Sequence, residues 1–113
     1  MLGDEMNSTV ADGERPSWMF LTNHAHVLIA ISRNPELRQR DISRLVGITE
    51  GAVQRILHEL EDAGYLRRER IGRRNRYEID TDRPLRHPLE RDHTIADVLG
   101  ALNDGDRVEG SPV

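Results

Sequence analysis

The chain has 113 residues, a formal charge of −4 and a hydrophobic content of 36%, of which little is aromatic. This length fits one small domain with a modest aliphatic core, which a second subunit could support. The absence of cysteine excludes disulfides, thiolate zinc sites, iron–sulfur clusters and cysteine nucleophiles. No apolar run approaches the roughly 20 residues that span a bilayer, and the acidic N-terminus does not resemble a secretory signal. We therefore expect a soluble, cytoplasmic protein.

The two ends of the chain are polar and acidic, so residues 1–16 and 104–113 are predicted to be disordered tails. The apolar segment 17–21 (SWMFL) leads into a first helix. We expect Asn23 to cap this helix, which ends near Ser32 before an Asn-Pro break. Its apolar residues are Ala25, Val27, Leu28, Ala30 and Ile31.

Two short helices follow, joined through Gly47. The first covers about residues 39–46 and is expected to turn Ile42, Leu45 and Val46 to one face. The second begins after Thr49, a good N-cap, and stops at Gly64. Ser43 is small and lies where the two crossing helices come closest. Gly47 occupies the turn, where a residue with positive φ is usually required. This pattern is typical of a helix-turn-helix, with apolar residues at Ile42, Val46, Ile48, Val53 and Ile56. In the second of the two helices, Val53, Ile56, Leu57 and Leu60 recur at the spacing of an amphipathic helix.

After Gly64 the apolar period changes to two, which predicts a β-hairpin. Residues 66–71 form the first strand, 72–75 the turn, and 76–79 the returning strand, with Tyr77 and Ile79 on one face. Residues 67–76 (RRERIGRRNR) contain six arginines and one glutamate. They carry a charge of +5, so the other 103 residues sum to −9. This local charge requires a negatively charged partner or internal pairing.

A proline-containing connector leads to a last helix that Thr94 is expected to cap. The apolar stripe of this helix either packs on its own domain or forms a dimer seam, and we favour the seam because the connector isolates the helix. The predicted dimerisation residues are Ile95, Val98, Leu99 and Leu102.

A helix, a helix-turn-helix and a basic hairpin in this order resemble the winged helix-turn-helix of bacterial and archaeal regulators. The sequence EDAGYLRRERIGRRNRYEI is similar to the recognition-helix end and wing of the MarR-like group. By length the chain is equally similar to compact ArsR-like regulators. The resemblance covers about residues 18–80, within a predicted DNA-binding domain at 17–80. It implies a mostly α fold with a small β-hairpin, in which a three-helix core carries a wing, and residues 81–103 add a connector and a C-terminal helix.

The resemblance also implies a sequence-specific regulator of transcription that binds double-stranded DNA as a homodimeric repressor without a cofactor. Helix 49–63 would enter the major groove, and wing 67–79 would contact the backbone or minor groove. A glycine inside this helix costs about 1 kcal/mol relative to alanine, so Gly51 needs a packing or docking reason. The predicted base-reading residues are Thr49, Glu50, Gly51, Gln54 and Arg55. The predicted backbone contacts are Arg38, Arg40, Arg44, Arg70, Arg73, Arg74, Asn75 and Arg76.

Other interpretations remain open at this point. The hairpin arginines could be solvated and paired, for example Arg76 with Glu69, and Arg55 could pair with Glu59. The winged helix could also be a protein–protein or RNA interaction module, or an ArsR-like sensor of a metal or an unidentified small-molecule effector. His24 and His26 point in different directions on one helix, so we predict no metal site. No catalytic motif is present, and residues 58–62 lack the second histidine of HExxH, so we predict no enzyme.

Overall fold

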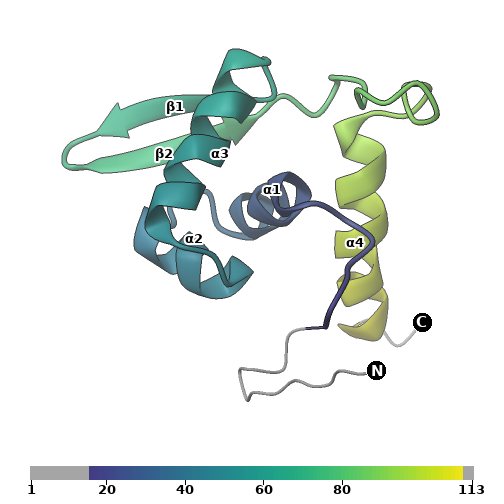
Figure 1. Cartoon of the computed structure of the whole chain (residues 1–113), viewed down its shortest axis with the longest axis horizontal. Coiled ribbons are helices and arrows are strands. Elements are labelled where there is room, and N and C mark those ends of the chain that lie inside the picture. Colours follow the sequence, from purple (N-terminus) through teal and green to yellow (C-terminus); the bar gives the residue numbers. More distant parts are fainter. Residues whose placement is uncertain (1–15, 111–113) are drawn as a thin grey trace.

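The computed structural model describes residues 16–110, with side chains to Asn103. The elements follow in the order α1 (Asn23–Arg33), α2 (Gln39–Val46), α3 (Glu50–Asp62), β1 (Leu66–Ile71), β2 (Arg74–Ile79) and α4 (Ile95–Gly110). In Figure 1, α1 lies at the centre, with α2 and α3 on one side and α4 on the other, and the β1–β2 hairpin projects away from the helices. This mostly helical arrangement with one two-stranded antiparallel sheet confirms the predicted fold class.

The N-cap of α1 lies one residue before the predicted position. Thr22 has an extended backbone, and its hydroxyl accepts a hydrogen bond from the Ala25 backbone N–H at 3.4 Å, so Thr22 is the N-cap. The prediction for Asn23 is therefore wrong: Asn23 is the first helical residue, and its side chain contacts His26 Nδ1 at 3.1 Å. The helix ends at Arg33, one residue beyond the expected end.

The turn between α2 and α3 has the predicted chemistry. Gly47 adopts a left-handed conformation with φ of 85°, and its N–H donates to the Ser43 carbonyl at 2.8 Å. The Ser43 hydroxyl donates to the Ile48 carbonyl at 2.6 Å, which ties the turn to the preceding helix. Thr49 then caps α3 by accepting from the Ala52 N–H at 3.1 Å. These contacts set the direction in which α3 leaves α2.

The C-terminal end of α3 is closed by Gly64, whose φ is also 85°. The Gly64 N–H donates to the Glu61 carbonyl at 3.0 Å, and the Tyr65 N–H donates to the Leu60 carbonyl at 2.9 Å. This pair of bonds is the Schellman motif, which satisfies carbonyls that a helix end leaves without partners. The turn delivers the chain directly into β1, so the hairpin starts at a fixed position beside α3.

Replacing Gly64 with alanine is expected to lower the free energy of unfolding by about 1–2 kcal/mol, because a left-handed conformation is costly for an L-residue. The added methyl would also lie 2.5 Å from Arg83 Nη2, so that side chain must move. Urea unfolding followed by circular dichroism measures the change. Gly51→Ala is the matched control, since its methyl would meet only Thr49 Oγ1 at 3.9 Å and alanine favours helix. Equal stability of Gly64→Ala and the wild type would contradict this account.

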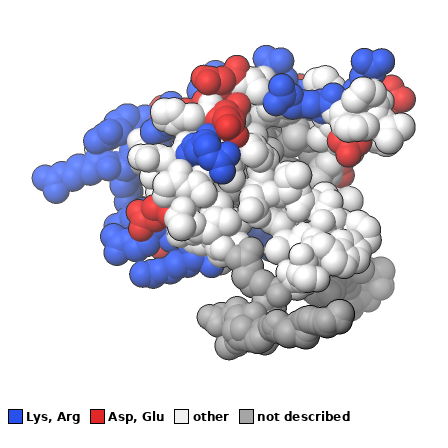
Figure 2. All heavy atoms as spheres, viewed as in Figure 1, with Lys and Arg blue, Asp and Glu red and all other residues white. Residues whose placement is uncertain are grey.

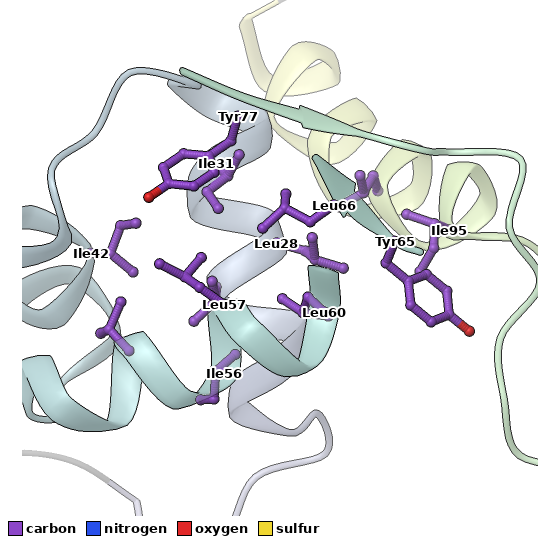
Figure 3. Close-up of a cluster of buried hydrophobic side chains, with 13 residues drawn as sticks. Leu28, Ile31, Ile42, Ile56, Leu57, Leu60, Tyr65, Leu66, Tyr77 and Ile95 are labelled. Carbon is purple, nitrogen blue, oxygen red and sulfur yellow. The ribbon is translucent and has the colours of Figure 1, made fainter. Parts of the chain in front are cut away.

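The hydrophobic core collects side chains from the helices and the hairpin, and Figure 3 shows them converging around Leu57. Leu57, Ile42 and Val53 are fully buried. Of the three residues predicted to share one face of α2, Ile42 is buried and Val46 packs partly against the core, whereas Leu45 is 67% exposed because only the Ile42 side of this short helix faces the core. The buried set is Val27, Leu28, Ile31, Ile42, Val53, Ile56, Leu57, Leu60, Tyr65, Leu66, Tyr77, Ile95 and Leu99.

The hairpin pairs its two strands in a register that gives each face a distinct role. Leu66 lies opposite Ile79 and Ile71 opposite Arg74, so the turn is only Gly72 and Arg73, shorter than the predicted 72–75. Gly72 has φ of 62°, as such two-residue turns require. Because directly opposed residues share a face, the inner face consists of Leu66, Arg68, Arg70, Asn75, Tyr77 and Ile79. Its Leu66–Ile79 end packs on the core, and its Arg70–Asn75 end extends beyond it.

Helix α4 packs against α1 within the same chain. Ile95 and Leu99 are buried in the core, so they form no free seam in this structure, whereas Val98 is half-buried and Leu102 is more exposed. The start of the helix is capped reciprocally: the Asp97 carboxylate accepts from the Thr94 N–H at 3.0 Å, and Thr94 Oγ1 accepts from the Asp97 N–H at 3.4 Å. The first of these bonds, with a second from His93, lowers the pKa of Asp97.

The boundaries of the predicted tails differ from the structure at one end. Helix α4 continues to Gly110, whereas a disordered tail was expected to begin at residue 104. Residues 1–15 and 111–113 lie outside the part that the structure describes, and the predicted N-terminal tail falls almost wholly there. Within the described part, no helix combines the length and apolar character needed to cross a bilayer.

Candidate nucleic-acid interface

Many of the arginines lie on the hairpin and around α2. Figure 2 shows basic side chains at the projecting end of the hairpin and over α2, with an acidic side chain beside those of α2 and further basic side chains at the upper right of the view. All the predicted backbone-contacting arginines have exposed side chains: Arg38, Arg40 and Arg44 around α2, and Arg70, Arg73, Arg74 and Arg76 on the hairpin. Asn75, also predicted, is half-buried on the inner face. The local charge seen in the sequence thus becomes a basic surface in three dimensions.

Two arginines near the end of the hairpin remain unpaired. Within residues 16–103, neither Arg73 nor Arg76 makes an ion pair, although Arg76 lies directly opposite Glu69 in the register. Arg74 is held only loosely, with its Nη1 4.0 Å from Glu36 Oε1, and Arg70 donates to the Gly72 carbonyl at 3.1 Å. The alternative ion pair between Arg76 and Glu69 is therefore not formed, and the guanidinium groups of Arg73 and Arg76 are available to a ligand.

The other hairpin arginines have protein partners. Arg67 pairs with Glu78 on the outer face, where both side chains are largely exposed. Arg68, on the inner face, donates to both Glu61 oxygens, at 2.9 and 3.0 Å. This bond raises the pKa of Arg68, and the two side chains are only 30% and 24% exposed. Arg68 thus connects the hairpin to α3, a role that sequence reasoning missed although Arg68 falls two residues after buried Leu66.

Helix α3 presents an open face between the hairpin and α2 (Figure 1). Burial of Val53, Ile56 and Leu57 turns Gly51, Gln54 and Arg55 outward, as predicted from the spacing. A methyl on Gly51 would meet nothing but Thr49 Oγ1 at 3.9 Å, so no packing contact of the described chain explains this glycine.

A family model described as the MarR family matches residues 20–76, half of the chain. The chain belongs to the MarR family. The match begins just before α1 and ends inside β2, so it covers the helix-turn-helix and most of the wing. MarR-family proteins are winged-helix regulators of transcription, which agrees with the basic surface and the open face of α3.

A relative from Methanocaldococcus jannaschii, "Uncharacterized protein MJ1254", is 37% identical over 60 residues. The shared segment is 52% of this chain but 13% of the relative. The chain therefore corresponds to a small part of that longer protein, and the likeness concerns one domain.

The predicted base-reading residues of this MarR-family chain differ in their surroundings. Thr49 uses its oxygen as the helix cap, and Glu50 is exposed in the first turn. Arg55 Nη1 lies 3.6 Å from Glu59 Oε1, so the alternative pairing at i+4 is formed. In contrast, Gln54 makes no hydrogen bond or ion pair within residues 16–103 and is free to contact a ligand.

Glu59 is shared between two helices. Its carboxylate contacts His24 Nε2 of α1 at 2.7 Å as well as Arg55 of α3. The hydrogen bond from His24 holds the pKa of Glu59 below its usual value, and the charge of Arg55 lowers it further. The ion pair with Glu59 holds the Arg55 side chain against the Glu59 side of α3 when no ligand is bound.

One exposed residue of α3 was missed by the sequence analysis. His58 follows Gln54 by four residues, so both lie on the same helix face. The spacing could have identified it. The other histidines of this region have protein partners, since His24 contacts Glu59 and His26 contacts Asn23. Across residues 16–103 no group of three or more metal-binding side chains comes together.

Proposed function

We propose that this chain is a sequence-specific, double-stranded DNA-binding repressor that acts as a homodimer. The observation that supports it most is the placement of α3: its open face lies between two sets of exposed arginines, those around α2 and those on the hairpin. Duplex DNA presents phosphates on both sides of its major groove, so a helix in the groove needs cations on either side. Membership of the MarR family supports the same function.

In this proposal the wing supplies affinity rather than sequence specificity. Arg73 and Arg76 have no protein partner in the described region, so a phosphate or a narrow minor groove can accept from them without an ion pair being broken. Roughly three to six phosphate contacts per subunit would give a log–log salt slope of about −0.9 for each phosphate neutralised. The acidic remainder of the chain opposes non-specific binding elsewhere on the surface.

Specificity is assigned to the front of α3. Gln54 can form two hydrogen bonds with adenine, and Arg55 can bind guanine or a phosphate once it leaves Glu59. Glu50 can accept from cytosine, Thr49 can donate through its hydroxyl, and Gly51 allows the backbone to approach the bases. Two copies related by a two-fold axis would read half-sites about 34–36 Å apart, and occupation of a promoter would block transcription.

Selection of bound sites from a random duplex library tests this function, and a palindromic motif is the expected result. Gln54→Ala should relax the preference at one position of each half-site, at a cost of about 1–3 kcal/mol for the preferred base. Gln39→Ala, which changes the same residue type on α2, is the matched control and should leave the motif intact. Binding without any sequence preference, or equal effects of the two substitutions, would count against base reading by α3.

A further inference from the structure

Two cationic or titratable side chains contact the same oxygen of Glu59 on α3. His24 Nε2, on α1, lies 2.7 Å from Glu59 Oε1, and Arg55 Nη1 lies 3.6 Å from that oxygen. We call these three residues the Glu59 network. Arg55 belongs to the proposed base-reading face, whereas His24 and Glu59 have no part in the proposed DNA contacts. Because α1 packs against α3 (Figure 1), the network connects the central helix of the fold to the helix that reads DNA.

The hydrogen bond between His24 and Glu59 exists whether or not the ring of His24 is charged. This bond keeps the pKa of Glu59 below its usual value, and the charge of Arg55 lowers it further, so the carboxylate is ionised near neutral pH. An ionised carboxylate can only accept hydrogen bonds, so Nε2 carries a hydrogen in both states of the ring. The proton that the ring gains or loses is therefore on Nδ1, which makes no hydrogen bond within residues 16–103. Water can exchange this proton, since the His24 side chain is 42% exposed.

Protonation of His24 changes the charge that Arg55 faces. With a neutral ring, His24 and Glu59 together carry one negative charge, which attracts the Arg55 guanidinium. With an imidazolium ring the two charges cancel, so the attraction for Arg55 falls. A guanidinium released from Glu59 can turn to a guanine or a phosphate. Histidine is the residue type whose charge changes between about pH 5 and 8, so this release occurs near neutral pH.

No other histidine of the described region contacts Glu59. His26 lies on the same helix as His24, but its Nδ1 contacts Asn23 Oδ1 at 3.1 Å. His58 is exposed on α3, and His87 Nδ1 accepts from the Leu89 N–H at 3.0 Å. Helix α4 contributes only apolar side chains to the groove that His24 lines. The charged and titratable groups around His24 are Arg55, His58, Glu59 and Asp62 on α3 and Arg86, His87 and Glu90 on the connector.

We propose that His24 is a positioning residue for base reading: when it is protonated, Glu59 releases Arg55 to the DNA, and when it is neutral, Glu59 retains Arg55. DNA binding is therefore coupled to proton uptake on α1, outside the DNA-contacting surface. This inference rests on the proposed function and adds a pH dependence that Arg55 transmits. The ion pairs are exposed, so the coupling is about two- to fivefold in affinity per subunit.

The affinity of the full chain for random duplex DNA, measured by fluorescence anisotropy between about pH 5.5 and 8 at constant ionic strength, tests the coupling. We expect the wild type to gain about two- to fivefold more affinity than His24→Gln as the pH falls, because glutamine can donate to Glu59 but cannot become charged. His26→Gln is the matched control and should keep the wild-type profile, since His26 does not contact Glu59.

Arg55→Ala should remove the same part of the pH dependence, because Arg55 transmits it. Combining His24→Gln with Arg55→Ala should remove no more than either change alone, which is the result expected of residues that act through one another. Additive effects of the two changes would overturn the proposal, because His24 would then act through its own charge on the DNA. A His24→Gln variant with the full pH dependence of the wild type would overturn it as well.

A second measurement does not depend on DNA. In the free chain, the NMR signal of the Arg55 Nε–H should shift with pH at the same midpoint as the ring of His24, and this shift should disappear in His24→Gln. Duplex binding together with an Arg55 signal that ignores His24 would remove this inference alone. If the Arg55 signal follows His24 but no duplex is bound at any pH, the proposed function fails and the coupling within the Glu59 network stands.

Discussion

Changing Arg73, Arg74 and Arg76 together to alanine is expected to lower the affinity for random duplex DNA at least about a thousandfold, since three charged hydrogen bonds at the low end of their range sum to about 4.5 kcal/mol. Arg73 and Arg76 have no partner in the described region and Arg74 only a distant one, so little protein structure depends on them. The log–log salt slope should become shallower by about 2.7 if each contacts one phosphate. Fluorescence anisotropy across a salt series measures both quantities.

The matched control is the triple change of Arg83, Arg86 and Arg91 to alanine, which removes the same charge from the connector. If the position of the charge matters, this variant should bind DNA nearly as the wild type does. Equal losses in the two triple variants would attribute binding to overall charge. Unchanged binding by the wing variant would instead favour a winged helix that grips an acidic protein or RNA.

The glycine positions of the turns and the Thr49 cap were accessible from sequence because they depend on local backbone conformation, although the cap of α1 was placed one residue too late. Gly47, Gly64 and Gly72 each occupy a left-handed position, and such positions favour glycine whatever surrounds them. The burial of Val53 and Leu57 follows from helical spacing in the same way. These features fix the order and the approximate bounds of the elements, so the winged-helix fold could be predicted.

Contacts between elements could not be predicted in this way. An apolar stripe shows which face of a helix is buried but not what covers it, so α4 was assigned to a dimer seam while the structure packs Ile95 and Leu99 in the chain's own core. In the same way, the apolar residues of α2 cover more of its circumference than the core contacts, so Leu45 remains exposed.

In the candidate site, too, local features could be predicted from the sequence, whereas contacts between elements could not. Outward positions such as Gln54 follow from spacing, since the buried residues of α3 fix its open face. The bond from Arg68 to Glu61 and the contact of His24 with Glu59 depend on how the elements pack. They could not be read from the order of residues, and the DNA contacts themselves remain predictions.

Replacing Glu61 with alanine is expected to weaken DNA binding by about tenfold, although it removes a negative charge beside the proposed interface. Glu61 accepts two hydrogen bonds from Arg68 on the inner face of the hairpin, and Arg70 and Asn75 lie on the same face beyond it. The pair therefore sets the angle at which the wing leaves α3. Its loss should also lower the free energy of unfolding by about 2–3 kcal/mol, because a half-buried guanidinium is left without its partner. Urea unfolding and anisotropy measure the two effects.

The salt slope separates this role from direct contact. If Arg68 only positions the wing, Glu61→Ala weakens binding without changing the slope, and exchanging the two residues (Glu61→Arg with Arg68→Glu) restores much of the affinity. Glu78→Ala removes the partner of Arg67 on the exposed outer face and should cost at most about 1 kcal/mol. Tighter binding by Glu61→Ala, with a slope steeper by about 0.9, would mean that Glu61 restrains an arginine that otherwise reaches a phosphate. The direction of the affinity change therefore decides whether Arg68 belongs to the scaffold of the wing or to its DNA-contacting surface.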